Sequence, residues 1–114
     1  MYRGPVEFPC INPEHVGHAY RFAYMASDPW GWVKLDVTSG RTWHVACIAG
    51  PHMEPAFVPR SACATEDDGW IVGFVLLSGR PMFCIVDART MKMVCIMDAP
   101  DANQVGIHGF YVVD

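Results

Sequence analysis

The fold is decided by the stretch Trp70-Ile71-Val72-Gly73-Phe74-Val75-Leu76-Leu77, which is followed by Ser78-Gly79-Arg80-Pro81 and then by Met82-Phe83-Cys84-Ile85-Val86-Asp87. Two runs rich in β-branched and aromatic residues flank a short turn-forming segment, which predicts two antiparallel strands joined by a hairpin. Pro81 has no N–H for a ladder hydrogen bond, so it belongs at the edge of a strand or outside it.

Short segments of the same kind continue on both sides of this hairpin. No window of a dozen residues keeps the apolar spacing of an amphipathic helix. Turn signals recur at roughly 8–12 residues, which is typical of a sandwich, barrel or propeller. The expected strands are Ala19–Met25, Gly31–Val37, Thr42–Ala49, Ala56–Pro59, Trp70–Leu77, Met82–Asp87, Met91–Met97 and Gly109–Val113.

The expected strands fall into two groups, residues 19–49 and residues 56–97. Each group holds three or four antiparallel strands, the size of a propeller blade. We find no residue-by-residue repeat between them. Residues 1–18 contain three prolines and are expected to be an extended, loop-like segment. Propellers have about four to eight blades, so we predict that these 114 residues are a fragment of a larger ring.

Composition excludes several classes of protein. Hydrophobic residues make up 52% and charged residues 18%, which a disordered chain would not show. The net charge is −4 and there is no basic stripe, so nucleic acid is not an expected partner. The longest apolar run is far shorter than the roughly 20 residues of a membrane-spanning helix. The five cysteines never form C-x-x-C, which argues against a zinc or disulfide framework and favours an intracellular reducing compartment, plastid or cytosol.

Three residues could carry chemistry. His108 lies between small neighbours near the chain end, and Glu7 and Glu54 lie among apolar residues. Judged from the local sequence alone, a structural turn is favoured for His108 and contact with solvent for both glutamates. A buried carboxylate would need a partner, and an imidazole N–H is one such partner. The remaining histidines match no zinc spacing; they are His15, His18, His44 and His52.

Several motifs in register carry a family resemblance over nearly the whole chain. They are Glu7-Phe8-Pro9-Cys10-Ile11-Asn12, Arg21-Phe22-Ala23-Tyr24, Lys34-Leu35-Asp36, Glu54-Pro55-Ala56-Phe57-Val58-Pro59-Arg60, Glu66-Asp67-Asp68-Gly69-Trp70, Val86-Asp87-Ala88 and His108-Gly109. With these motifs the chain resembles the carboxy-terminal part of the carotenoid cleavage oxygenases. That family includes plant carotenoid and epoxycarotenoid dioxygenases and the visual-cycle retinoid isomerase.

The resemblance implies a seven-bladed β-propeller with Fe(II) on its axis, bound by four histidines and supported by three glutamates. His108 corresponds to the last histidine ligand, and Glu7 and Glu54 correspond to two of the supporting glutamates. The other three histidines and the third glutamate are expected upstream of this chain. Residues 104–114 would hold the iron ligand and a closing strand. They depart from the usual P-x-G-F-H-G pattern, because the sequence here is Gln104-Val105-Gly106-Ile107-His108-Gly109.

The implied reaction is cleavage of a double bond of a carotenoid or apocarotenoid by O2 at Fe(II), which gives two carbonyl products. The full-length protein would meet its substrate at a membrane surface. With one ligand of four, the isolated chain is expected to be inactive.

The acidic Glu66-Asp67-Asp68-Gly69 is interpreted as a solvated turn rather than a calcium site. The alternative hypothesis is a small non-enzymatic all-β domain that binds a partner or an apolar ligand.

Overall fold

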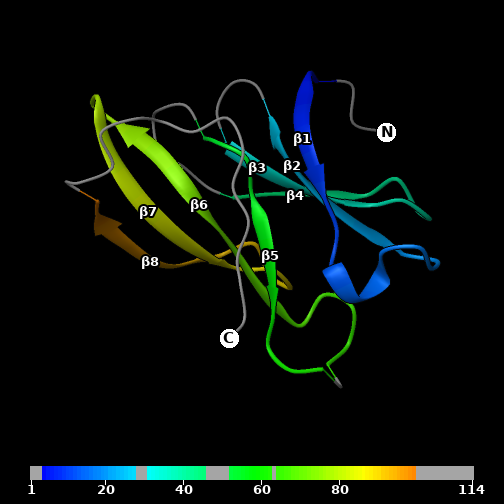
Figure 1. The fold of residues 1–114 in the computed structure, drawn as a ribbon. Helices are drawn as coiled ribbons and strands as arrows, with labels where there is room; N and C mark the ends of the chain where they lie inside the picture. Colours follow the sequence, from blue (N-terminus) through cyan, green and yellow to red (C-terminus); the bar gives the residue numbers. More distant parts are fainter. Residues whose placement is uncertain (1–3, 28–30, 46–51, 63, 100–114) are drawn as a thin grey trace.

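The computed structural model describes residues 4–27, 31–45, 52–62 and 64–99. These residues form two four-stranded antiparallel sheets, and in each sheet the strands lie side by side in chain order (Figure 1). The first sheet contains β1 (Val6–Cys10), β2 (Phe22–Ser27), β3 (Gly31–Asp36) and β4 (Thr42–His44). The second contains β5 (Ala56–Pro59), β6 (Gly69–Leu77), β7 (Arg80–Asp87) and β8 (Met93–Asp98). The 3₁₀ helix η1 (Pro13–His15) follows β1, and no helix in the described ranges has the length and apolar character needed to cross a membrane.

The first sheet begins earlier than the sequence predicts. Strand β1 lies inside the segment 1–18 that was expected to be loop-like, and it pairs with β2. The pairing shifts register between Glu7 and Cys10, where Phe8 has a positive φ of 53°. Such an irregularity hides the alternation by which strands are recognised in a sequence. The predicted strand 109–113 lies outside the described residues, as does the end of the predicted strand 42–49.

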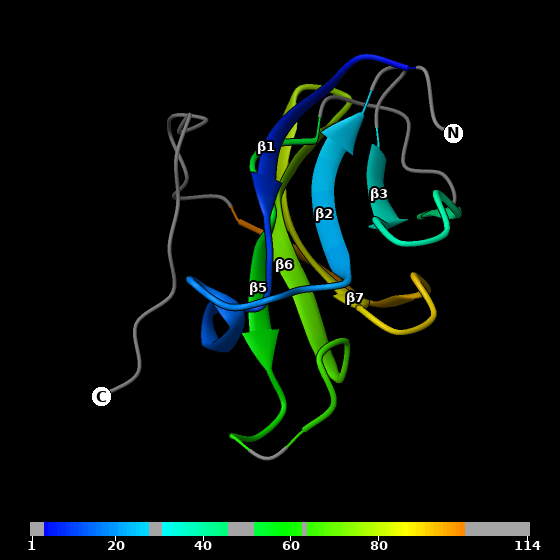
Figure 2. The same cartoon turned by 90° about the vertical axis from the view of Figure 1, so that its right-hand side faces the viewer.

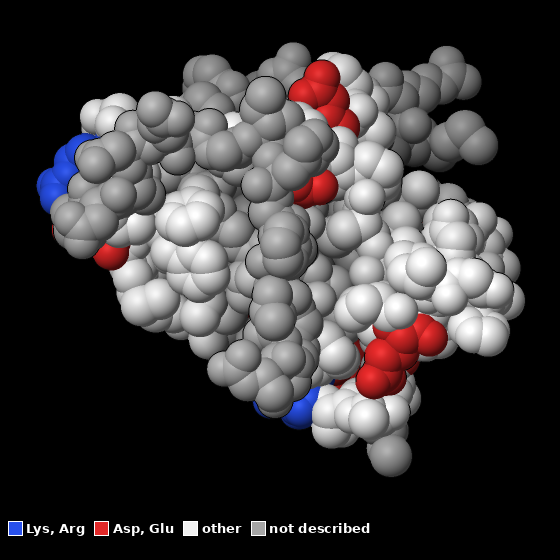
Figure 3. Space-filling view, viewed as in Figure 1, with Lys and Arg blue, Asp and Glu red and all other residues white. Residues whose placement is uncertain are grey.

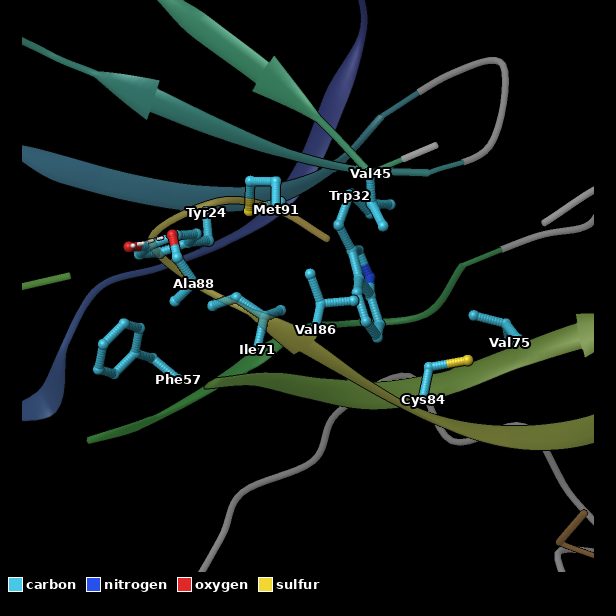
Figure 4. Packing of buried hydrophobic residues seen from close by; sticks show 11 residues of the cluster. Tyr24, Trp32, Val45, Phe57, Ile71, Val75, Cys84, Val86, Ala88 and Met91 are labelled. Carbon is cyan, nitrogen blue, oxygen red and sulfur yellow. Dashed lines mark hydrogen bonds between the residues drawn. The ribbon is translucent and has the colours of Figure 1, made fainter. Parts of the chain in front are cut away.

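The core lies between the two sheets, which pack against each other through one face each (Figures 2 and 4). In β6 the core side is set by strict alternation, because Ile71 and Val75 are buried while Phe74 is exposed. The position between them on the same face is Gly73, and the ring of Trp32 fills the space there. The buried residues of this core are Tyr24, Ala26, Trp32, Val45, Phe57, Ile71, Val75, Cys84, Val86, Ala88 and Met91.

The β3–β4 and β7–β8 turns repeat the same hydrogen bonds. In each, an aspartate, Asp36 or Asp87, accepts through Oδ1 from the two N–H groups two and three residues further along, at 2.9–3.3 Å. Its carbonyl oxygen accepts from the N–H of a residue with positive φ, Gly40 at 72° or Met91 at 58°. The two sheets therefore do contain a short residue-level repeat. This repeat was not found from the sequence because Met91 stands in the second copy where the first copy has Gly40.

Candidate functional site

The two candidate glutamates occupy equivalent places in the two sheets. Glu7 lies on β1, opposite Ala26, and Glu54 lies just before β5. Each therefore stands at the beginning of the first strand of its sheet. Glu7 is exposed and Glu54 is half-buried. In Figure 3 the acidic side chains of the described residues appear as separate groups among residues that carry no charge. The structure thus gives the two sheets one carboxylate each at matching positions.

Cys10, at the end of β1, has a partly buried thiol that lies near Glu54 and β5. Burial raises the pKa of the Cys10 thiol to about 12, and the nearby Glu54 carboxylate contributes to this rise. A hydrogen bond from the backbone of Phe57, on β5, lowers the pKa of the same thiol. The end of β1 therefore lies close to Glu54 and to the first half of β5, which agrees with the nearness of the two strands in Figures 1 and 2.

We predict that Cys10 reacts with iodoacetamide at pH 8 far more slowly in the folded protein than in the unfolded chain. The thiolate is the nucleophile, and a rise in pKa from 9.0 to about 12 lowers the thiolate fraction at pH 8 roughly a thousandfold. Because the folded-state pKa is raised, the contribution of this thiol to the stability of the fold is fully present below about pH 9 and is lost as the pH rises toward 12. Mass spectrometry of the Cys10 peptide measures the rate, and equal rates in both states would contradict the prediction.

A buried cation joins the two sheets at the other end of β5. Lys34 of β3 is only 2% exposed, and its Nζ lies 2.8 Å from Oδ2 of Asp67 in the β5–β6 connection. The same Nζ donates to the carbonyl oxygen of Arg89 at 3.3 Å and lies 4.1 Å from the ring centroid of Phe22. The ammonium group is thus compensated by a carboxylate, a carbonyl and an aromatic face.

Glu66 reinforces the same junction through backbone groups. Its Oε1 accepts hydrogen bonds from the N–H groups of Arg21 and Phe22, both at 2.7 Å, and its carbonyl oxygen accepts from the side chain of Asn12 at 3.1 Å. The turn interpretation of Glu66-Asp67-Asp68-Gly69 is therefore incomplete, because two of these acidic side chains bind the opposite sheet. Lys34 was not singled out in the sequence. Alternation along β3 puts Lys34 on the same face as the large apolar Trp32, and this is the signal that could have indicated its burial.

Arg21 and Asp36 form a second charged contact beside this junction. Two nitrogens of the Arg21 guanidinium donate to Oδ2 of Asp36 at 3.1 and 2.8 Å. This hydrogen bonding, with that from the N–H groups of the turn, holds the pKa of the Asp36 carboxyl well below its usual range. Asp36 therefore stays ionised and keeps both the turn and the Arg21 contact at neutral pH.

Of the five histidines, the structure describes all except His108. His108 lies outside the described residues, so its place relative to Glu7 and Glu54 remains a prediction. Within the described part of the chain, no group of three or more His, Cys, Asp or Glu side chains could hold a metal ion. His52, expected in a loop, is buried and forms an isolated bridge with Val75. His44 is exposed on β4.

Comparison with known proteins identifies the class of this fold. The structure superimposes on that of a point mutant of the Synechocystis apocarotenoid oxygenase with a TM-score of 0.76 at 28% identity, and the match covers 84% of this chain and 23% of that one. A cobalt-substituted form of that enzyme matches equally well. The two stacked antiparallel sheets are therefore part of a β-propeller, as the strand pattern predicts.

The sequence assigns the family. The family model described as retinal pigment epithelial membrane protein, RPE65, matches residues 1–113. The chloroplastic 9-cis-epoxycarotenoid dioxygenase NCED6 of Arabidopsis thaliana is 35% identical over 112 residues, covering 90% of this chain and 19% of the relative. The apocarotenoid-15,15'-oxygenase of Synechocystis is 33% identical over 104 residues, covering 79% and 21%. This chain belongs to the RPE65 and carotenoid cleavage oxygenase family, and it spans about a fifth of these relatives' length.

Proposed function

We propose that this chain is the carboxy-terminal part of an Fe(II)-dependent dioxygenase that cleaves a double bond of a carotenoid or apocarotenoid with O2. The family supports the substrate class, since its relatives are named for carotenoid and apocarotenoid cleavage. The observation that carries the proposal is the equivalent placement of Glu7 and Glu54 at the beginnings of β1 and β5. First strands of successive blades approach the propeller axis, where a single ion could be shared.

The side chains of this segment suit a supporting role toward iron. Neutral imidazole is a good ligand for Fe(II). A carboxylate that accepts the second ring N–H of a ligand histidine fixes its tautomer and raises its basicity. Glu7 and Glu54 would perform this task, and His108 would be a ligand. Iron, when bound, would supply the activation of O2. Because the described residues form no metal cluster by themselves, the remaining ligands would come from elsewhere in the protein.

Iron binding and product analysis test this proposal on the protein that contains the chain. We expect one Fe(II) per molecule and two carbonyl products from an apocarotenoid under O2. Glu7→Gln and Glu54→Gln should each weaken Fe(II) binding about 10–100-fold, the usual effect of losing a partner of a metal ligand. Glu14→Gln in η1, where the side chain is exposed, is the matched control and should change nothing.

Two results would contradict the proposal. Unchanged Fe(II) affinity in both Glu7→Gln and Glu54→Gln would remove the glutamates from the site. Tight stoichiometric Fe(II) binding by these 114 residues alone would show that one histidine ligand is not all that this segment offers. We expect the isolated chain to bind little iron and to cleave nothing.

A further inference from the structure

Trp32 connects the first sheet with the segment that carries Glu54. Its side chain projects from β3 into the core between the sheets and is fully buried (Figure 4). The indole Nε1 donates a hydrogen bond to the carbonyl oxygen of Met53 at 2.8 Å. The ring of His52 meets the indole edge-on, with the centroids 5.3 Å apart. A residue of the first sheet thus binds the backbone immediately before Glu54, in the segment that leads into the second sheet.

The backbone around Glu54 is fixed from both directions. The N–H of Met53 donates to the carbonyl oxygen of Phe74 on β6 at 2.9 Å, so both polar groups of Met53 are engaged. Pro55 follows, fully buried, and a residue before proline is restricted to extended conformations. The direction in which the Glu54 side chain leaves the backbone therefore depends on where Met53 is held.

Gly73 allows these groups to approach closely. A Cβ atom at this position would lie 2.7 Å from Cζ2 of Trp32 and 3.0 Å from the carbonyl oxygen of Glu54. Real Cβ atoms essentially never come within 3.0 Å of another heavy atom, as the contact with Trp32 would require, and the distance to the Glu54 oxygen is tighter than most real contacts. The indole and the Glu54 peptide group therefore both pack against the same backbone position of β6, and a methyl group added there would press on both.

We propose that Trp32 is a positioning residue for Glu54: its indole N–H, across the interface between the sheets, holds the Met53 carbonyl and so aims the Glu54 carboxylate. This inference rests on the proposed function, in which Glu54 supports an iron-ligating histidine. A small displacement of the backbone would turn that carboxylate away from its imidazole partner, and outer partners of metal ligands are sensitive to such changes.

A double-mutant cycle tests the proposal in the protein that contains this chain. Trp32→Phe keeps a large ring in the core but removes the N–H donor. Fe(II) affinity is measured by competition with a chelator for the unaltered protein, Trp32→Phe, Glu54→Gln and the double variant. Trp70→Phe is the control, since Trp70 lies on the opposite face of β6, with its ring 4.3 Å from the Arg60 guanidinium carbon. Urea unfolding of each variant confirms that it is folded.

We expect Trp32→Phe to weaken Fe(II) binding about 3–10-fold alone and less than about twofold when Glu54 is already glutamine, because the two residues act through one route. Trp70→Phe should leave the affinity unchanged. Equal weakening by Trp32→Phe in both backgrounds, or no weakening at all, overturns the positioning role while leaving the function of Glu54 intact. If Glu54→Gln itself has no effect, the role proposed for Glu54 fails instead, and the inference fails with it.

Gly73→Ala provides a second variant that acts on the same contact from β6. The added methyl group must displace the indole or the Glu54 carbonyl, so we expect the same dependence on the Glu54 background. It gives the answer even if Trp32→Phe does not yield folded protein. A folded Gly73→Ala protein with unaltered Fe(II) affinity overturns the proposal.

Discussion

Asp67→Ala is expected to lower the free energy of unfolding by about 3–5 kcal/mol, as removal of one partner from a buried ion pair does. The substitution leaves the ammonium of Lys34, which is 2% exposed, without the carboxylate that lies 2.8 Å away. The Arg89 carbonyl and the Phe22 ring remain, but neither carries a negative charge. Urea denaturation of the protein that contains this chain measures the loss.

The reverse substitution should be milder. Lys34→Met keeps most of the volume and removes the buried charge, while Asp67 is 18% exposed and lies 3.9 Å from Arg89. Its carboxylate can therefore be hydrated and partly compensated, so we expect a loss of about 1–2 kcal/mol. The double variant Lys34→Met/Asp67→Ala should be more stable than Asp67→Ala alone. If Asp67→Ala stays within about 1 kcal/mol of the unaltered protein, the ion pair does not hold the sheets together.

Gly69→Ala should be the next most damaging change, with a loss at or above the upper end of the roughly 1–3 kcal/mol that overpacking costs. A Cβ at Gly69 would collide with the carbonyl oxygen of Val58, on the paired strand β5, and would come within 2.8 Å of the Phe57 ring. The carbonyl belongs to the sheet and cannot rotate away as a side chain could. Strands β5 and β6 would have to separate at this end.

The control for this prediction is Gly79→Asn in the β6–β7 turn. Gly79 also has a special role, since its φ is 77°, but nothing lies within 4 Å of the position where a Cβ would stand. Asparagine tolerates the left-handed conformation, so we expect a loss below about 1 kcal/mol. Thermal or urea unfolding compares the two variants. A Gly69→Ala protein as stable as Gly79→Asn would show that the close approach at Gly69 is relieved without strain.

The strands and turns follow from local patterns. The 70–77 and 82–87 runs form β6 and β7, because alternating apolar residues give each strand one face for the core. Gly40 has the positive φ expected for its turn. Strand β1 was missed because Phe8 and Pro9 interrupt its regular pairing. The equivalence of the Asp36 and Asp87 turns was missed because Met91 adopts the conformation usually reserved for glycine.

The candidate site depends more strongly on what the chain brings together. The family motifs predict Glu7 and Glu54 as site residues, and in the structure they lie at the beginnings of β1 and β5. Neither motif predicts that the indole of Trp32 holds the Met53 carbonyl, 21 residues away. Local sequence also made the acidic turn look solvated, although Glu66 accepts from backbone groups 44 and 45 residues earlier in the chain.

By itself the sequence determined that this protein is all-β, where most strands of the described residues lie apart from β1, where the hairpins turn and to which family the chain belongs. The strands and turns depend on residues within about ten positions of one another, through alternation and φ preferences. The family depends on short motifs that keep their order over nearly the whole chain. Only the tertiary structure decided which charges are buried, which sheet face meets which, and what holds Glu54. Stacking the sheets buries the Lys34 ammonium, which is compensated by Asp67, and the Trp32 N–H, which donates to the Met53 carbonyl.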